Sequence, residues 1–188
     1  MAEDFSTQGM LEIYLYENGQ LLERLQEIVL EYKDEESFDE DSINEIFRAM
    51  HTIKGSSGVM MYDEITKIAH KLEDVFYYLR ESKPDNVPHM ELVEHVLQVV
   101  DFISSEMIKI ENGQPADGSS ADYVEALDKF LNKIKSGKGE AKKEIKENEK
   151  LKESKDLNQR LYLILLKQLV RNFKHLNLTR ILLLKKRI

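Results

Sequence analysis

Apolar residues recur at helical spacing in five stretches of the chain, and short polar segments separate these stretches. Spacings of three and four residues are typical of a helix that packs one face against a core. No stretch shows the alternation that favours a β-strand. In the first stretch, residues 5–33, the repeating apolar positions are Leu11, Tyr14, Leu15, Leu21, Leu22, Leu25, Ile28 and Val29. The pattern therefore predicts an all-α protein.

The polar segments between the stretches indicate where the next two helices begin. Ser42 follows an acidic segment and is the predicted N-cap of the second helix, with Glu45 in the capping-box position. The second helix is then expected to start at Ile43. Asp63 is the predicted N-cap of the third helix, which ends before the loop sequence KPDNVP at 83–88.

Two further helices complete the expected architecture. The fourth is predicted at about residues 88–110 and the fifth at 121–136, with Gly137 as its end. Short connections between successive helices favour antiparallel neighbours. The expected fold is an up-and-down antiparallel helical bundle, in which a four-helix core carries a fifth helix.

The second helix contains an unusual segment, AMHTIKGSSGVM at 49–60, where two glycines and two serines interrupt good helix formers. On a helical wheel, His51 lies about 80° from Ile43, at the edge of the apolar stripe. Gly55 and Gly58 continue that edge by one and two turns, so no side chain covers His51 on that side. The stripe itself is predicted to consist of Ile43, Ile46, Phe47, Met50 and Met61, with Met60 as further core filling.

The third helix has a similar polar edge. Its predicted apolar stripe consists of Ile65, Ile68, Ala69, Leu72 and Phe76. Glu73 lies about 80° from Ile65, and His70 lies on the more exposed side. If the two stripes pack together, Glu73 can lie beside His51, with Lys54 and His70 close by.

These side chains suit a phosphoryl relay. A neutral imidazole is a nucleophile near pH 7. A carboxylate that binds one ring nitrogen fixes the tautomer, leaves the other nitrogen's lone pair outward and stabilises the developing positive charge. A nearby ammonium offsets the charge of phosphoryl oxygens, and bare glycines leave room for a bulky partner.

Composition limits the other functions. The chain of 188 residues has no cysteine, which excludes disulfides, thiolate metal sites and a cysteine nucleophile. Its polar N-terminus is not a signal peptide, and no apolar run is long enough to span a membrane, so a cytoplasmic protein is expected. Residues 1–154 carry 18 basic and 34 acidic side chains. This acidic balance disfavours nucleic acid as a partner.

The C-terminal part differs in character. Residues 137–159 are rich in charge and are predicted to be a flexible linker. Residues 160–188 are basic and rich in leucine. One interpretation is an amphipathic helix that contacts a membrane surface or a partner; the other is a segment that does not belong to an evolved domain.

The residues also resemble a known family. FRAMHTIKGSSGVM at 47–60, followed by ITKIAHKLEDVF at 65–76, is similar to the histidine-phosphotransfer (HPt) domain of CheA-type chemotaxis histidine kinases. The combination of H-[ST]-[IL]-K-G with a later A-H-x-[LM]-E is specific, and the resemblance extends over residues 5–136. It implies that His51 is the phosphoacceptor, that Glu73 orients the imidazole, and that Lys54 and His70 complete the polar site.

The resemblance implies partners as well. A CheA-type kinase domain would transfer phosphate from ATP to His51, and the receiver domain of a CheY- or CheB-like response regulator would take it onto an aspartate. No Gly-rich ATP-binding motif occurs in residues 137–188. The chain is therefore expected to bind no cofactor itself and to be a phosphocarrier, not a kinase.

Two alternatives from other classes stay open. A metal-binding bundle would use His51, His70 and Glu73 as ligands, although the repeated carboxylates of di-iron bundles are missing. A purely structural bundle would explain the helices but not the glycines beside His51. The isolated histidines His89, His95 and His175 are expected to be surface or capping residues.

Overall fold

The computed structural model describes residues 2–137, with side chains from residue 8 onward. In this range all regular structure is helical, as the apolar spacing predicted. The helices are α1 (Ala2–Tyr32), α2 (Glu40–Val59), α3 (Asp63–Ser82), α4 (His89–Glu111) and α5 (Ala121–Lys135). Apart from Gly137, the predicted linker at 137–159 lies outside the described residues, as does the Leu-rich segment at 160–188.

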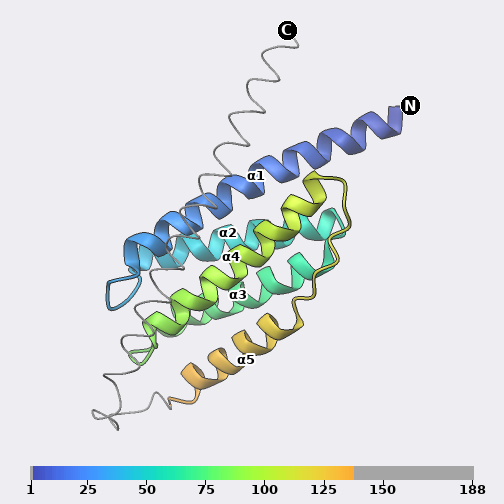
Figure 1. Cartoon of the computed structure of the whole chain (residues 1–188). Coiled ribbons are helices and arrows are strands. Elements are labelled where there is room, and N and C mark those ends of the chain that lie inside the picture. Colours follow the sequence, from blue (N-terminus) through green and yellow to red (C-terminus); the bar gives the residue numbers. More distant parts are fainter. Residues whose placement is uncertain (1, 138–188) are drawn as a thin grey trace, which may run out of the picture. The chain divides into compact units, whose positions relative to one another are not determined.

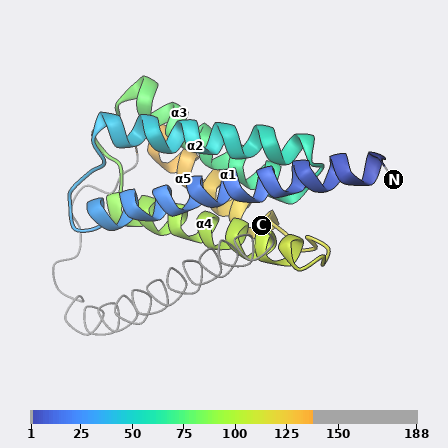
Figure 2. The same cartoon turned by 90° about the horizontal axis from the view of Figure 1, so that it is seen from above.

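The first four helices run up and down and form a closed bundle (Figure 1). Each packs against the next in sequence, and α4 returns to lie against α1. Helix α5 lies outside this core, against α3 and α4. Viewed from above, the N-terminal part of α1 extends beyond the other helices (Figure 2). The predicted four-helix core with a fifth helix is confirmed.

The core is formed by the predicted apolar faces. Leu25 and Ile28 of α1 are almost fully buried, as are Ile46 and Met50 of α2. All five residues of the predicted α3 stripe are buried as well. Burial of each such side chain contributes roughly 1.5–3 kcal/mol to the free energy of folding. Apolar packing in this core is therefore the main interaction that holds the site-bearing helices α2 and α3 together.

Two predicted helix starts were wrong, and Met61 does not lie in the core as predicted. Helix α2 begins earlier than expected, because the Asp39 carboxylate accepts a hydrogen bond from the Ser42 N–H at 2.7 Å and is the N-cap. Asp63 is the first residue of α3 and not its cap. Met61 is 83% exposed because α2 ends at Val59 and Met61 adopts a positive φ, so the helical wheel no longer applies there.

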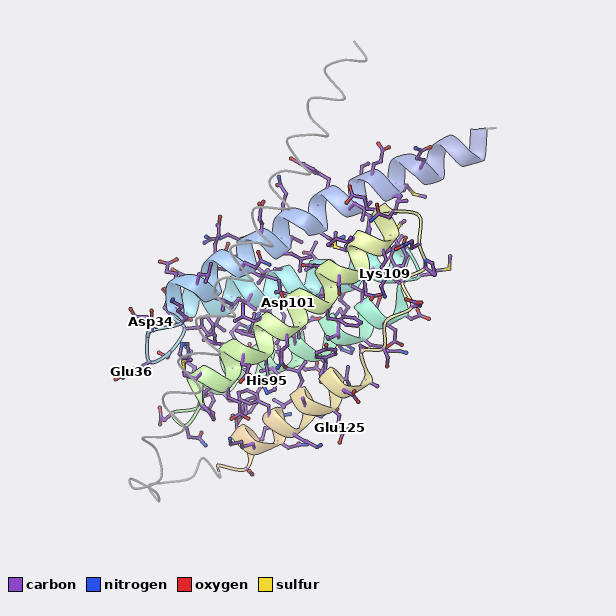
Figure 3. The ribbon with its side chains drawn as sticks, viewed as in Figure 1. Asp34, Glu36, His95, Asp101, Lys109 and Glu125 are labelled. Atoms are coloured by element: carbon purple, nitrogen blue, oxygen red, sulfur yellow. The ribbon has the colours of Figure 1, made fainter. Side chains whose placement is uncertain are left out.

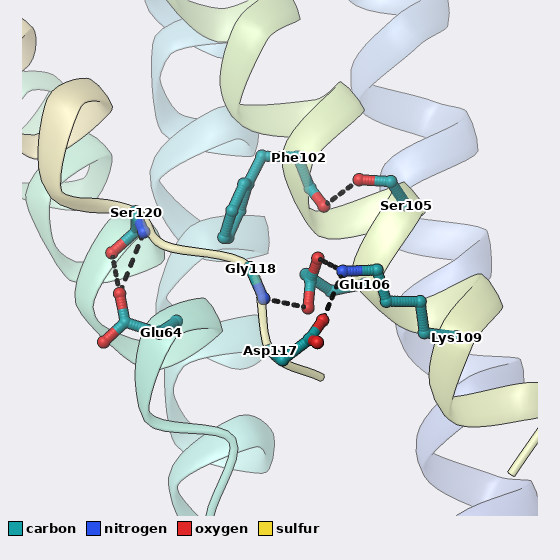
Figure 4. Close-up of polar contacts among 8 residues, drawn as sticks. All are labelled: Glu64, Phe102, Ser105, Glu106, Lys109, Asp117, Gly118 and Ser120. Atoms are coloured by element: carbon teal, nitrogen blue, oxygen red, sulfur yellow. Dashed lines mark hydrogen bonds and ion pairs between the residues drawn. The ribbon is translucent and has the colours of Figure 1, made fainter. Parts of the chain in front are cut away.

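Two carboxylates tie the α4–α5 loop to the bundle (Figure 4). The buried Glu106 accepts a hydrogen bond from the Gly118 N–H at 3.0 Å and one from Lys109 at 2.8 Å. A Cβ atom on Gly118 would collide with the Glu106 carboxylate, so a larger residue there would displace this side chain. Glu64 of α3 accepts hydrogen bonds from both the N–H and the hydroxyl of Ser120. The loop thereby fixes where α5 begins.

The outside of the bundle is polar. Charged side chains such as Asp34 and Glu36 in the α1–α2 loop and Glu125 on α5 are exposed to solvent (Figure 3). Among residues 2–137, no helix is both long and apolar enough to cross a bilayer.

Candidate functional site

The structure places the histidine of α2 against the glutamate of α3. His51 Nδ1 lies 2.8 Å from Glu73 Oε1. An ionised carboxylate can only accept, so Nδ1 carries the proton and donates it to this hydrogen bond. The His51 side chain is 64% exposed. Its Nε2 therefore keeps a free lone pair that is open to solvent.

Glu73 is buried and binds two partners. Lys54 Nζ lies 2.6 Å from Oε2, the carboxylate oxygen that His51 does not use, and forms an ion pair with it. Burial by itself would raise the Glu73 pKa, but the Lys54 ammonium and the His51 N–H outweigh this effect and lower the pKa. Glu73 is thus an anion at neutral pH and holds both the Lys54 ammonium and the His51 N–H.

His70 is not part of this cluster. Its Nε2 lies 3.7 Å from Asp74 Oδ1, one turn along α3, and its side chain is 60% exposed. Asp74 in turn lies 3.5 Å from Lys71 Nζ. The contact that the structure gives His70 lies along its own helix, and its expected position beside His51 stays a prediction.

The glycine edge is open. A Cβ atom added to Gly55 would meet nothing within 4 Å, and one added to Gly58 would only touch Thr66 at 3.9 Å. Neither residue has a positive φ, so the backbone does not require glycine at either position. The surface beyond His51 toward the C-terminus of α2 thus lacks side chains, although the fold would accept them.

The serines between these glycines face the opposite way, which the sequence did not reveal. Buried Ser57 shares a hydrogen bond of 3.0 Å with the Tyr14 hydroxyl of α1. Ser56 donates to Asn18 Oδ1 at 2.9 Å, and Asn18 is itself 1% exposed. These small polar residues attach α2 to α1 directly behind the open edge. On the helical wheel Ser57 falls about 40° from Ile43, within the apolar stripe, and a polar residue at that position was the available signal.

A second group was also missed. The Phe47 ring lies one turn before His51, with 6.2 Å between ring centroids and 24° between ring planes. The Arg80 guanidinium carbon lies 4.2 Å from the Phe47 centroid, and the Tyr77 ring lies 6.3 Å from it. The helical wheel predicts Phe47 in the core stripe, but the residue is half-buried and its ring lies beside that of His51. Its position four residues before His51 was the available signal.

The donor groups do not suit a metal ion. Among the described residues, no three histidine or carboxylate side chains are placed to hold one. Of the three ligands in the metal-binding alternative, His51 and Glu73 contact each other, whereas the contact of His70 is with Asp74. His89 is buried, and its Nε2 contacts the carbonyl oxygen of Tyr32, the last residue of α1, at 2.7 Å, which fits a capping residue and not a surface one. His175 lies outside the described residues.

Comparisons with known proteins place the chain in a family. The model of the Hpt domain family matches residues 9–102. The chemotaxis protein CheA of Borreliella burgdorferi is 30% identical over 128 residues, which cover 68% of this chain and 14% of that protein. The sensor histidine kinase CheAY of Helicobacter pylori is 29% identical over 138 residues, 73% of this chain and 17% of that protein. The chain thus spans about a sixth of the relatives that it matches.

Solved structures show the same fold. A solution structure of the histidine phosphotransfer domain of CheA superimposes with a TM-score of 0.55 at 27% identity, over 78% of this chain and all of that chain. The phosphorylated P1 domain of CheA3 from R. sphaeroides, solved in complex with CheY6, superimposes with a TM-score of 0.59 at 20% identity. It covers 67% of this chain and 98% of the other.

Proposed function

The chain belongs to the Hpt domain family, and from this premise we propose that it carries a phosphoryl group on His51 in a CheA-like chemotaxis relay. The observation that carries the proposal is the hydrogen bond between His51 Nδ1 and Glu73. It fixes the tautomer in which the exposed Nε2 bears the lone pair. A purely structural bundle would have no need to orient an exposed imidazole with a buried carboxylate.

Phosphoryl acceptance follows from this geometry. The Nε2 lone pair attacks the γ-phosphorus of ATP, the N–P bond forms, and the bond to the bridging oxygen breaks with its electron pair leaving on ADP. The ring becomes cationic while Nδ1 keeps its proton. The Glu73 carboxylate, 2.8 Å away, stabilises this charge as it develops. Transfer to an aspartate carboxylate oxygen breaks the N–P bond and returns the ring to its neutral form.

Lys54 supplies the remaining charge. Its ammonium is held 2.6 Å from Glu73 Oε2, and its side chain is 26% exposed. From this position it can neutralise part of the charge on phosphoryl oxygens attached to His51. His70 is held by Asp74 and has no role in the transfer step in this proposal.

The family premise supports the partners. A separate CheA-type kinase domain binds ATP and phosphorylates His51, and the receiver domain of a CheY- or CheB-like response regulator removes the group. The solved complex of a CheA3 P1 domain with CheY6 supports a receiver as partner, because the two folds match. This chain acts as the carrier, and ATP is bound by the kinase domain.

The test is phosphorylation of the purified chain by a CheA-type kinase core with labelled ATP. We expect one phosphoryl group per chain, labile in acid and stable in alkali, as an N–P bond is. The label should be lost in His51→Gln, while circular dichroism shows an unchanged helical content. His70→Gln is the matched control, since it removes an equally exposed histidine and should keep the label. Label that persists in His51→Gln would contradict the proposal.

A further inference from the structure

The His51 imidazole is held at a single atom by Glu73. One hydrogen bond, at Nδ1, fixes the position of that atom but leaves the ring free to turn about it. With 64% of the side chain exposed, the surrounding packing restricts this motion little. In-line attack on phosphorus requires the Nε2 lone pair to point in one direction. A second contact is needed to fix the ring plane.

Phe47 supplies a flat surface beside the imidazole. The two ring planes differ by only 24°, at a centroid separation of 6.2 Å. Side chains on a helix lean toward its N-terminus, so the imidazole leans toward Phe47 and away from Gly55. If the imidazole rotated out of this plane, its edge would turn toward the Phe47 ring. The Phe47 ring therefore opposes this rotation.

The Phe47 ring is in turn held from α3. The Arg80 guanidinium lies over its face, 4.2 Å from the centroid, and Arg80 Nε donates to Glu81 at 3.0 Å. The Arg80 side chain is 29% exposed, so its position is defined by these contacts and not by deep burial. Guanidinium groups are attracted to the negative face of an aromatic ring.

We propose that Phe47 is a positioning residue that fixes the plane of the His51 imidazole, and that Arg80 acts through Phe47 by holding its ring in place. The proposal rests on His51 being the phosphoacceptor. It assigns the two sides of His51 different tasks: the filled side with Phe47 and Arg80 orients the ring, and the bare side at Gly55 and Gly58 admits partners.

The variants Phe47→Leu and Arg80→Gln test the proposal in the full chain, with phosphorylation by a CheA-type kinase core. Leu keeps an apolar side chain but removes the flat face, and Phe47→Tyr restores that face. We expect kcat to fall about tenfold in Phe47→Leu and about threefold in Arg80→Gln, with KM nearly unchanged, because the encounter is intact and the attack geometry is not. Phe47→Tyr should recover most of the rate.

A spectroscopic measurement separates positioning from stability. The ring current of Phe47 shifts the NMR resonances of the His51 imidazole protons. These resonances should therefore move in Arg80→Gln, although Phe47 is still present. Lys135→Gln is the matched control. Lys135 Nζ lies 5.4 Å from the Tyr78 ring centroid and forms a cation–π pair that does not include a neighbour of His51. It should change neither the rate nor the His51 resonances.

The possible outcomes are distinct. A rise in KM at constant kcat in either variant would show that these side chains contact the partner, and would overturn the proposal. Wild-type kinetics in both variants would overturn it as well, and Arg80→Gln gives this answer even if Phe47→Leu fails to fold. The proposed function itself fails if the wild-type chain is not labelled or if His51→Gln remains labelled, so the two failures are distinguishable.

Discussion

The site pairs a buried anion, Glu73, with an exposed nucleophile, His51. Glu73 is buried and binds His51 and Lys54 with its two oxygens, whereas His51 is open to solvent. A buried carboxylate is stable as an anion only when such partners satisfy it. The same contacts that permit its burial therefore also set the tautomer of the nucleophile.

Replacement of Glu73 separates orientation from stability. In Glu73→Gln, the neutral amide neither stabilises the imidazolium nor holds Lys54, so we expect phosphoryl acceptance to slow by about tenfold to a hundredfold. Unfolding in urea should show a much smaller relative effect, because Gln keeps the volume and one acceptor. A loss of rate that merely follows the unfolded fraction would make Glu73 a structural residue.

The pH dependence of that pair has a definite sign. The folded-state pKa of Glu73 is lowered, so its ion pair contributes stability above the ordinary carboxyl pKa and loses it as the pH falls through the folded value. The stability difference between the wild-type protein and Glu73→Gln should therefore shrink on acidification below about pH 4.5. Denaturant titrations at several pH values measure this difference.

Gly55 offers a test of access. Since a Cβ atom there meets nothing and φ is ordinary, Gly55→Leu should raise the free energy of unfolding by up to about 1 kcal/mol through helix propensity. We expect the same variant to slow transfer at least about tenfold, because the side chain would occupy the approach to His51. Gly9→Leu is the control, as Gly9 is an equally open helical glycine on α1. Normal transfer in Gly55→Leu would show that the glycine does not serve access.

At the scale of elements, α2 presents two different faces within one short segment. Gly55 and Gly58 face solvent beside the site, whereas Ser56 and Ser57 bind Asn18 and Tyr14 of α1. Burial raises the pKa of the Tyr14 hydroxyl to about 12, so it remains a neutral hydrogen-bonding group. The weak helix formers in α2 are thus explained by contacts on one side and openness on the other.

Glu64 binds Ser120 at the start of α5, and this contact predicts a pH effect. Hydrogen bonds from Lys67 and then from Ser120 lower the Glu64 pKa to about 2, below its ordinary value of 4.5. Its contribution is therefore complete above about pH 4.5 and is lost as the pH falls toward 2. At pH 7, Glu64→Gln should reduce the free energy of unfolding by roughly 1–2 kcal/mol, since the group is partly exposed and screened.

The measurement for Glu64 is hydrogen exchange of the α5 amides together with denaturant unfolding. Faster exchange in α5 than in α2 would locate the effect at the α4–α5 loop. Lys67→Gln is the control, because it removes the ion pair at 2.6 Å but keeps both Ser120 hydrogen bonds. An equal loss of stability in the two variants would show that the ion pair, and not the loop attachment, carries the effect.

At the scale of the whole molecule, residues 2–137 contain a complete helical core with the site on one seam, between α2 and α3. All contacts that build the site come from α1, α2 and α3. Helices α4 and α5 support these helices from the other side of the bundle. The site is thus a surface feature that depends on a buried scaffold.

This organisation predicts that a chain truncated after Gly137 folds and functions by itself. We expect its thermal unfolding to stay cooperative and its phosphorylation by a CheA-type kinase core to match that of the full chain within about twofold, since its core is self-contained. Circular dichroism and the labelling assay check both points. A truncated chain that is folded but poorly labelled would show that residues 138–188 take part in partner binding.

The sequence by itself determined the helices and their order, and it placed His51 and Glu73 at the polar edges of their helices, because helical periodicity sets which residues share a face. It did not determine that His70 turns to Asp74, that Ser56 and Ser57 bind α1, or that Phe47 lies between His51 and Arg80. Those facts depend on how one helix is rotated and shifted against another. Packing of the whole core sets that rotation, so only the tertiary structure decided it.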